Sequence, residues 1–198
     1  SPPCSRRCCS PSYPRRCCSQ TIVREAIPLE LVERVKGLIK HEAMEQAGLA
    51  VKGQDVDIDN ETEWTGSAYI HSILYRDPAF EEVLAATQPL ALVHLLLGKS
   101  ALMASLGCHF KGPGFATGEG ELPLHSDNGN GMIPPFRTFS EVANVNYALV
   151  DYSREQGGLA MVPGSHTPCR LPTPEESALG GENGNPAAVP MDLHPGDC

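Results

Sequence analysis

The sequence has few aromatic residues, no excess of basic residues and no long apolar run. Aromatic residues make up 6% of the 198 residues, whereas glycine and proline are common, with 19 and 18 copies. This composition favours a protein of many turns and short strands over a helical bundle. The net charge of −9 argues against nucleic acid or an anionic membrane surface as the main partner. The best candidate for a membrane span, Leu90–Leu97, is too short and contains His94.

Cysteines that could pair as a disulfide framework are also lacking over most of the chain. Five of the eight cysteines lie within residues 1–20, and Cys108, Cys169 and Cys198 occur singly. A secreted framework would distribute its pairs through the domain, so we expect a reducing compartment and a cytoplasmic protein. A location in an organelle stays open if residues 1–20 are a targeting segment.

Residues 1–20 contain no acidic residue and two copies of Arg-Arg-Cys-Cys. Adjacent cysteines do not have the spacing of a zinc knuckle, and the prolines would disrupt an amphipathic targeting helix. We therefore expect a disordered or extraneous leader, followed by one domain over residues 21–198. Metal binding by the paired cysteines and a targeting role are the alternatives.

Helices are expected in the first half of this domain and short strands in the second. Apolar residues three and four positions apart predict a helix over residues 28–47. A second helical stretch follows Asp77-Pro78 and runs to about Thr87, and a third begins at Pro89 and ends at Gly98. Glycine and proline then separate short apolar runs, which predict strands over residues 101–110, 121–126, 142–150, 159–162 and 188–193. This order predicts a mainly β fold, a sandwich or barrel with N-terminal helices.

His125 and Asp127 are the most informative residues for chemistry. Side chains two positions apart in a strand point to the same face, so both would project together from a strand. An imidazole and a carboxylate can occupy adjacent corners of an octahedral metal ion. A second histidine from a distant strand would complete the two-histidine, one-carboxylate triad that binds iron(II). A polar pair that bonds only to nearby loops is the alternative interpretation of the same two residues.

Further motifs surround this pair in a fixed order. They are Lys111-Gly112-Pro113, Pro-Leu-His-Ser-Asp over residues 123–127, Asn-Tyr-Ala-Leu-Val-Asp over 146–151, and Gln156–His166 with its Pro-Gly-Ser-His end. Over about residues 26–198 the chain resembles the phytanoyl-CoA dioxygenase family of Fe(II)/2-oxoglutarate-dependent oxygenases. The resemblance implies a double-stranded β-helix, the jelly-roll or cupin fold. It also implies an enzyme that uses Fe(II), 2-oxoglutarate and dioxygen to hydroxylate a small organic substrate, with 2-oxoglutarate decarboxylated to succinate.

The resemblance assigns roles to individual residues. His125 and Asp127 match the first two iron ligands, and Asn146 matches a position that faces 2-oxoglutarate. Asp127 indicates hydroxylation, because relatives that halogenate carry a small residue there. The Pro163–His166 loop matches a structural turn of the family, so His166 is not expected to bind iron.

The resemblance stops short near the end of the sequence. In relatives, a Gly-Asp turn and one further strand precede the second histidine ligand and the arginine that binds 2-oxoglutarate. Here Pro195-Gly196-Asp197 matches the turn, and the sequence ends at Cys198. We therefore expect a domain that is incomplete at its C-terminus and a chain that is inactive by itself. His194 lies before the turn and is not expected to be the missing ligand.

Asn128–Phe139 directly follows Asp127 and is expected to line the substrate entrance. Two other classes of function stay open. One is a catalytically silent jelly-roll binding module, and the other is a metal cupin that does not use 2-oxoglutarate. Iron-dependent formation of succinate would separate the first from an enzyme, and the arginine expected after the missing histidine would discriminate against the second.

Overall fold

The structure is a computed structural model that describes residues 21–46, 67–111, 123–127, 136–153, 156, 158–178 and 185–198. The chain forms two compact units. The first contains the described parts of Ser1–Ile22, Leu122–Val142 and Tyr152–Asp192, and the second contains those of Val23–Glu121, Ala143–Asp151 and Leu193–Cys198. Within these described ranges, no helix is both long and apolar enough to cross a bilayer.

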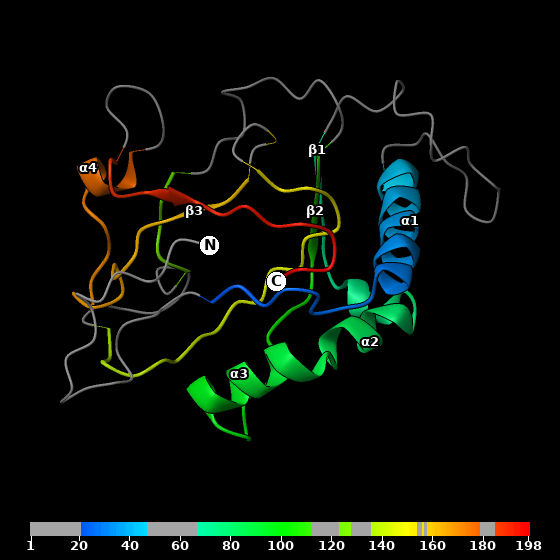
Figure 1. Ribbon diagram of the computed structural model, residues 1–198, viewed down its shortest axis with the longest axis horizontal. Coiled ribbons are helices and arrows are strands. Elements are labelled where there is room, and N and C mark those ends of the chain that lie inside the picture. The colour runs from blue at the N-terminus through cyan, green and yellow to red at the C-terminus, as the bar shows by residue number, and fades with distance from the viewer. Residues whose placement is uncertain are drawn as a thin grey trace. The chain divides into compact units, whose positions relative to one another are not determined.

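The second unit is built on α1 (Leu29–Gln46), which confirms the helix predicted over residues 28–47. Its most deeply buried residues recur at three- and four-residue steps and form one apolar face: Val32, Val35, Ile39 and Ala43. This face packs against β1 (Ser67–Ile70) and β2 (Cys108–Lys111), beside which α1 stands in Figure 1. Because burial of each large aliphatic side chain stabilises the fold by about 1.5–3 kcal/mol, packing is the main force that holds the helix.

Two shorter helices follow, as the sequence predicts. A 3-10 turn, η2 (Ile73–Tyr75), leads into α2 (Ala79–Leu84), and α3 (Thr87–Leu97) begins two residues before the predicted start at Pro89. The Asp77 carboxylate accepts a hydrogen bond from the Ala79 N–H at 2.8 Å. It therefore satisfies one of the N–H groups that lack a partner at the start of a helix.

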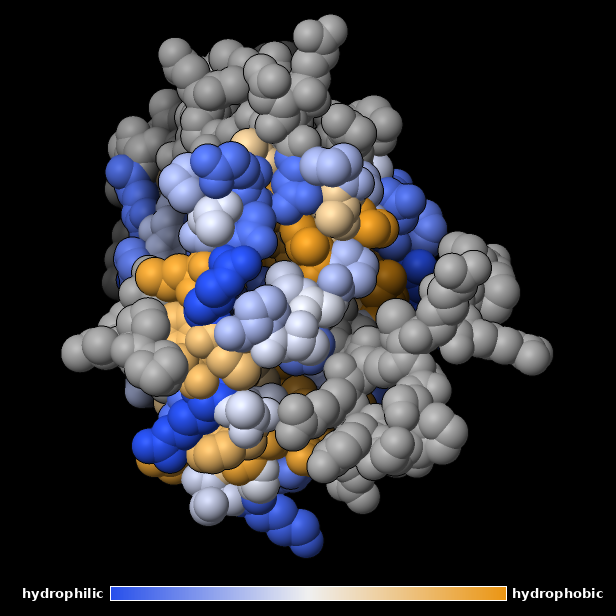
Figure 2. Space-filling view, turned by 90° about the vertical axis from the view of Figure 1, so that its left-hand side faces the viewer, coloured by the Kyte–Doolittle hydropathy of each residue, from blue (hydrophilic) through white to orange (hydrophobic). Residues whose placement is uncertain are grey.

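Apolar side chains also reach the surface near α3. Pro89 is the buried residue of this helix, and large exposed side chains follow it along the chain: Leu95, Leu96, Leu102 and Met103. Figure 2 shows hydrophobic side chains at the surface between polar ones on the face that it presents. The buried cluster of the second unit therefore depends on α1, β1, η2 and α2 rather than on α3.

β1 and β2 form an antiparallel pair in which Tyr69 lies opposite His109. The prediction of a strand over residues 101–110 is wrong for residues 101–107, which form no strand. One reason is a long-range contact, because the Leu106 carbonyl accepts a hydrogen bond from Ile73 N–H at 3.1 Å and thus pairs with η2. β1 was not predicted, since four residues are too few for an alternating pattern to be recognised.

The prediction of a strand over residues 142–150 is also wrong, because this segment makes isolated backbone pairings rather than a ladder. Ala148 N–H donates to the Asp197 carbonyl, and Gly196 N–H donates to the Ala148 carbonyl, both at 2.9 Å. Val23 and Cys198 exchange two further backbone hydrogen bonds, at 2.8 and 3.0 Å. The second unit thus joins segments that lie far apart in the sequence.

The first unit contains a second antiparallel pair, β3 (Ala160–Met161) with β4 (Val189–Pro190). Both strands fall inside the predicted ranges 159–162 and 188–193, which are confirmed for residues 160–161 and 189–190. The unit also holds α4 (Pro174–Ser177), a single helical turn that lies outside the predicted helices. This turn contacts the segment that carries His125.

Candidate metal centre

Thr173 and Glu176 build the start of α4. The Thr173 hydroxyl accepts a hydrogen bond from Glu176 N–H at 3.3 Å, and the Glu176 carboxylate accepts one from Thr173 N–H at 2.8 Å. This reciprocal pair is a capping box. Arg170 also binds the Glu176 carboxylate through both terminal nitrogens, at 2.7 and 2.9 Å. The hydrogen bonds from Arg170 and from the Thr173 backbone lower the pKa of Glu176 to about 2.

The end of α4 positions the segment of the candidate ligands. Carbonyl groups in the last turn of a helix lack partners inside the helix. The Ser177 carbonyl finds one in Leu124 N–H, which lies 3.0 Å away. Since Leu124 directly precedes His125, this hydrogen bond fixes the backbone next to the candidate ligand.

Residues 123–127 form a turn rather than a strand, so the strand predicted over residues 121–126 is wrong where the structure describes it. Two local features explain the difference. Pro123 has no N–H to donate to a ladder. In addition, the Pro123 carbonyl lies 2.8 Å from Nδ1 of His125, so the side chain of His125 takes up this acceptor.

The turn nevertheless brings the side chains of His125 and Asp127 together. Nε2 of His125 lies 3.3 Å from Oδ1 of Asp127, and each side chain is about half exposed, at 52% and 53%. A carbonyl can only accept, so the contact with Pro123 assigns the ring hydrogen to Nδ1. In the neutral imidazole, Nε2 then carries a lone pair that faces a carboxylate oxygen. These two acceptors repel each other unless a proton or a cation lies between them.

This arrangement fits a metal ion. Histidine ligands generally donate their other ring N–H to a carbonyl or a carboxylate, as His125 does to Pro123. Donor atoms on adjacent corners of an octahedral ion with bonds of about 2.1 Å lie about 3 Å apart. The separation of 3.3 Å between His125 and Asp127 is close to this value. Among the described residues, no group of three or more histidine, cysteine, aspartate or glutamate side chains could hold a metal.

The other predicted site residue, Asn146, belongs to the second unit and is exposed. Its contact with 2-oxoglutarate stays a prediction. His194 lies in the same unit, where its Nδ1 is 3.0 Å from Oδ1 of Asp151. Sequence reasoning missed this pair, because the two residues are far apart in the chain and no motif joins them.

The Pro163–His166 loop forms the turn that the sequence predicts. Ser165 N–H donates to the Val162 carbonyl at 3.1 Å, and Gly164 has a φ of +79°, in the region that favours glycine. His166 is exposed on this turn. Of the predicted entrance segment, residues 128–135 lie outside the described ranges.

The sequence of the chain matches a known protein family. The sequence model described as phytanoyl-CoA dioxygenase (PhyH) matches residues 30–198, which include His125, Asp127 and Asn146. The chain therefore belongs to the phytanoyl-CoA dioxygenase family, and the resemblance drawn from its motifs is confirmed. No curated protein and no solved structure matches it.

The family defines a broad class for the protein. Its members are in general dioxygenases of the Fe(II)- and 2-oxoglutarate-dependent type, with a cupin or jelly-roll fold. The helices at the start of the domain agree with the predicted fold class. The two short sheets of the described residues are compatible with a jelly roll but do not by themselves define one.

Proposed function

We propose that this protein is a non-haem iron(II), 2-oxoglutarate-dependent dioxygenase that hydroxylates a small organic substrate. The observation that carries the proposal is the geometry of His125, whose Nδ1 is bonded to the Pro123 carbonyl while its Nε2 faces Asp127. Membership of the phytanoyl-CoA dioxygenase family supports the class of reaction.

In this proposal, Nε2 of His125 and a carboxylate oxygen of Asp127 hold the iron. The Pro123 carbonyl keeps the ring hydrogen on Nδ1 and so leaves the Nε2 lone pair available to the metal. The Asp127 carboxylate neutralises part of the positive charge, and the Asn146 amide hydrogen-bonds 2-oxoglutarate. When bound, iron and 2-oxoglutarate supply the oxidising power for hydroxylation. One substrate C–H, one dioxygen and one 2-oxoglutarate then give one alcohol, one succinate and one carbon dioxide.

Iron binding tests the site without requiring turnover. We expect His125→Ala and Asp127→Ala each to weaken Fe(II) binding at least about tenfold, because each removes a donor atom from the ion. Equilibrium dialysis under anaerobic conditions measures the affinity. His166→Ala is the matched control, since it removes an exposed histidine from another turn of the same unit. Equal Fe(II) affinity in all three variants would contradict the site.

The reaction is tested with the protein produced from its full natural gene. We expect 2-oxoglutarate to be converted to succinate only when Fe(II) and dioxygen are present, and this conversion to be lost in Asp127→Ala. Succinate formation that persists in Asp127→Ala would mean that another residue holds the iron. A protein that binds iron at His125 and Asp127 but consumes no 2-oxoglutarate would instead be a metal cupin of another kind.

A further inference from the structure

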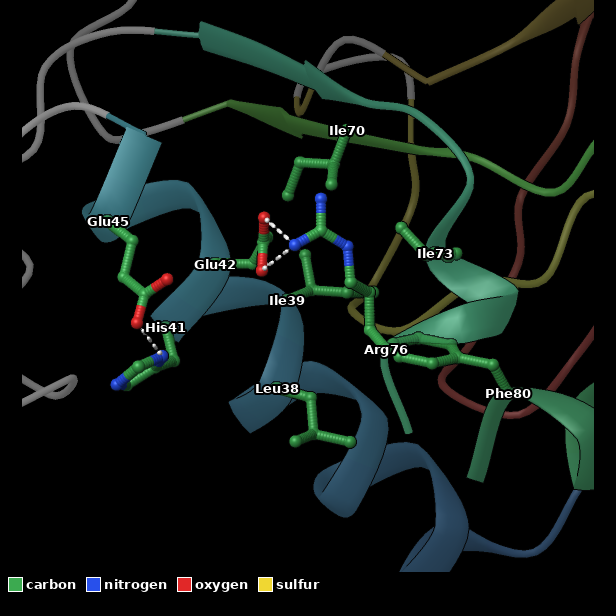
Figure 3. Close-up of a pocket in the computed structure, with 9 residues that line it drawn as sticks. All are labelled: Leu38, Ile39, His41, Glu42, Glu45, Ile70, Ile73, Arg76 and Phe80. Carbon is green, nitrogen blue, oxygen red and sulfur yellow. Dashed lines mark hydrogen bonds and ion pairs between the residues drawn. The ribbon is translucent and has the colours of Figure 1, made fainter. Parts of the chain in front are cut away.

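A pocket of about 360 Å³ lies within the second unit, between the last turns of α1, the end of β1 and the start of α2. Its floor consists of side chains from the buried core, each at most 5% exposed: Ile39, Ile70, Ile73 and Phe80. The more exposed part of its lining, called the rim below, carries titratable or charged side chains, which are drawn in Figure 3: His41, Glu42, Glu45 and Arg76. The pocket is therefore apolar at its base and charged at its mouth.

Arg76 and Glu42 bind each other across this mouth. Nη1 of Arg76 lies 3.0 and 3.3 Å from the two carboxylate oxygens of Glu42, and the two side chains point toward one another in Figure 3. The Gln46 amide adds a hydrogen bond to the same carboxylate at 3.3 Å. Glu42 is thus supplied with donors, and the guanidinium is already paired with an anion.

The carboxylate of Glu45 has different partners from that of Glu42. Its side chain is only 22% exposed, and its ion-pair partner among the described residues is Nδ1 of His41, at 3.6 Å. That separation is longer than a hydrogen bond. With two carboxylates and one guanidinium, the rim is net negative when His41 is neutral. Among the described residues, Glu45 is thus a partly buried carboxylate without a donor at hydrogen-bond distance. Because it lines the same pocket as the apolar floor, the pocket suits a ligand that brings both a cation and a hydrocarbon group.

We propose that this pocket binds a small amphipathic cation, a primary alkylammonium or arylalkylammonium. The ammonium group donates to the Glu45 carboxylate, and the hydrocarbon part covers Ile39, Ile73 and Phe80. An anion does not fit, because it would meet Glu45 while Arg76 is held by Glu42. This inference is independent of the proposed iron ligands His125 and Asp127, which belong to the other unit.

The experiment is a titration of the ¹⁵N-labelled chain, followed by its amide NMR signals. The ligands are hexylammonium, hexanol and hexanoate, which share one hydrocarbon chain and differ in charge. We expect hexylammonium to shift the amide signals of Ile39, Ile73 and Phe80, and to bind at least about tenfold more tightly than either of the others. Glu45→Gln should weaken hexylammonium binding about tenfold and leave hexanol binding unchanged. Glu33→Gln is the matched control, since it removes the same charge from an exposed position of α1 outside the pocket.

Either of two results would overturn the proposal. Hexanoate or hexanol that binds as tightly as hexylammonium would show that the charge of Glu45 is not recognised. Equal weakening by Glu45→Gln and Glu33→Gln would show that only the net charge of the chain attracts the ligand. The comparison of the three ligands uses the unaltered chain, so it decides the matter even if a variant folds poorly.

Discussion

Asp197 is a buried charged residue that joins segments from both ends of the second unit. It is 3% exposed, and its carboxylate accepts hydrogen bonds from His194 N–H at 2.9 Å and Glu25 N–H at 3.0 Å. Arg24 forms an ion pair with it. Burial raises the pKa of the Asp197 carboxyl, but the hydrogen bonds from His194, Glu25 and Arg24 outweigh burial and hold its pKa below the usual value. The folded chain therefore favours the carboxylate form.

This predicts a stability that depends on pH. Because the folded-state pKa is lower than the unfolded value of about 3.9, the carboxylate stabilises the fold above that value. The contribution is lost as the pH falls through the folded pKa. We expect Asp197→Asn to lower the free energy of unfolding by about 1–3 kcal/mol at pH 7 and by less at pH 3, as measured with urea. Glu30→Gln, at an exposed position, is the control, and an Asp197→Asn deficit of equal size at both pH values would contradict the argument.

Gly196 allows the backbone of the same turn to pass close to its neighbour. Its φ is +92°, and a Cβ atom there would lie 2.7 Å from the Ile27 carbonyl oxygen. We expect Gly196→Ala to destabilise the chain by about 2–4 kcal/mol, the sum of backbone strain and a forced contact. Gly98→Ala isolates the backbone part, because Gly98 has a φ of +86° and no atom within 4 Å of the added Cβ. Similar urea midpoints for the two variants would show that the contact with Ile27 does not lower the free energy of unfolding.

At the scale of single elements, the sequence predicts what depends on local pattern and misses what depends on a partner. α1 was predicted almost to the residue, because the spacing of its apolar residues directly specifies one buried face. Residues 101–107 and 142–150 have strand-like composition, but a strand forms only where a second segment aligns with it. That alignment is set by long-range contacts, such as the pairing of Ala148 with Gly196, which no local pattern encodes.

In the candidate site, too, the sequence predicts features that depend on local spacing and misses those that depend on a partner. The spacing of His125 and Asp127 predicts that their side chains converge, and they do converge, although on a turn instead of a strand. The carbonyl of Pro123 that orients the imidazole could not be predicted, since every residue has a carbonyl and its direction depends on the turn. The support from Ser177 in α4 was missed for the same reason.

α4 supplies a prediction about how the site is supported. We expect Thr173→Ala to remove the capping box and to destabilise the helical turn by about 1 kcal/mol. Because the Ser177 carbonyl holds Leu124, Fe(II) affinity should also fall, but by less than in His125→Ala. Thr173→Ser keeps the hydroxyl and should retain the Fe(II) affinity of the unaltered chain in the same dialysis measurement. Loss of iron binding in the serine variant would mean that the methyl group, and not the cap, supports the site.

At the scale of the whole molecule, the second unit pairs residues near the start of the described chain with residues at its end. Val23 pairs with Cys198, Ile27 N–H donates to the Gly196 carbonyl, and Arg24 pairs with Asp197. Contacts between residues so distant in sequence carry a high entropy of loop closure and form slowly. The last six residues are therefore part of the core of this unit, and Leu193 is 7% exposed there.

The two ends of the sequence should differ in how much stability they contribute. Deletion of residues 193–198 removes the pairings with Val23, Ile27 and Ala148 and leaves Arg24 without Asp197. We therefore expect the melting temperature to fall by more than about 10 °C, or the thermal transition to lose its cooperativity.

Deletion of residues 1–20 should change the melting temperature by less than about 2 °C. That tract has an excess of arginine and no periodic apolar residues. It can therefore bury too little apolar surface to offset the chain entropy that ordering it would cost. Calorimetry of the two deletion variants and of the full chain measures these melting temperatures. A large loss on removal of residues 1–20, or zinc that stays with the chain only while its five cysteines are present, would show that this tract has a structural role.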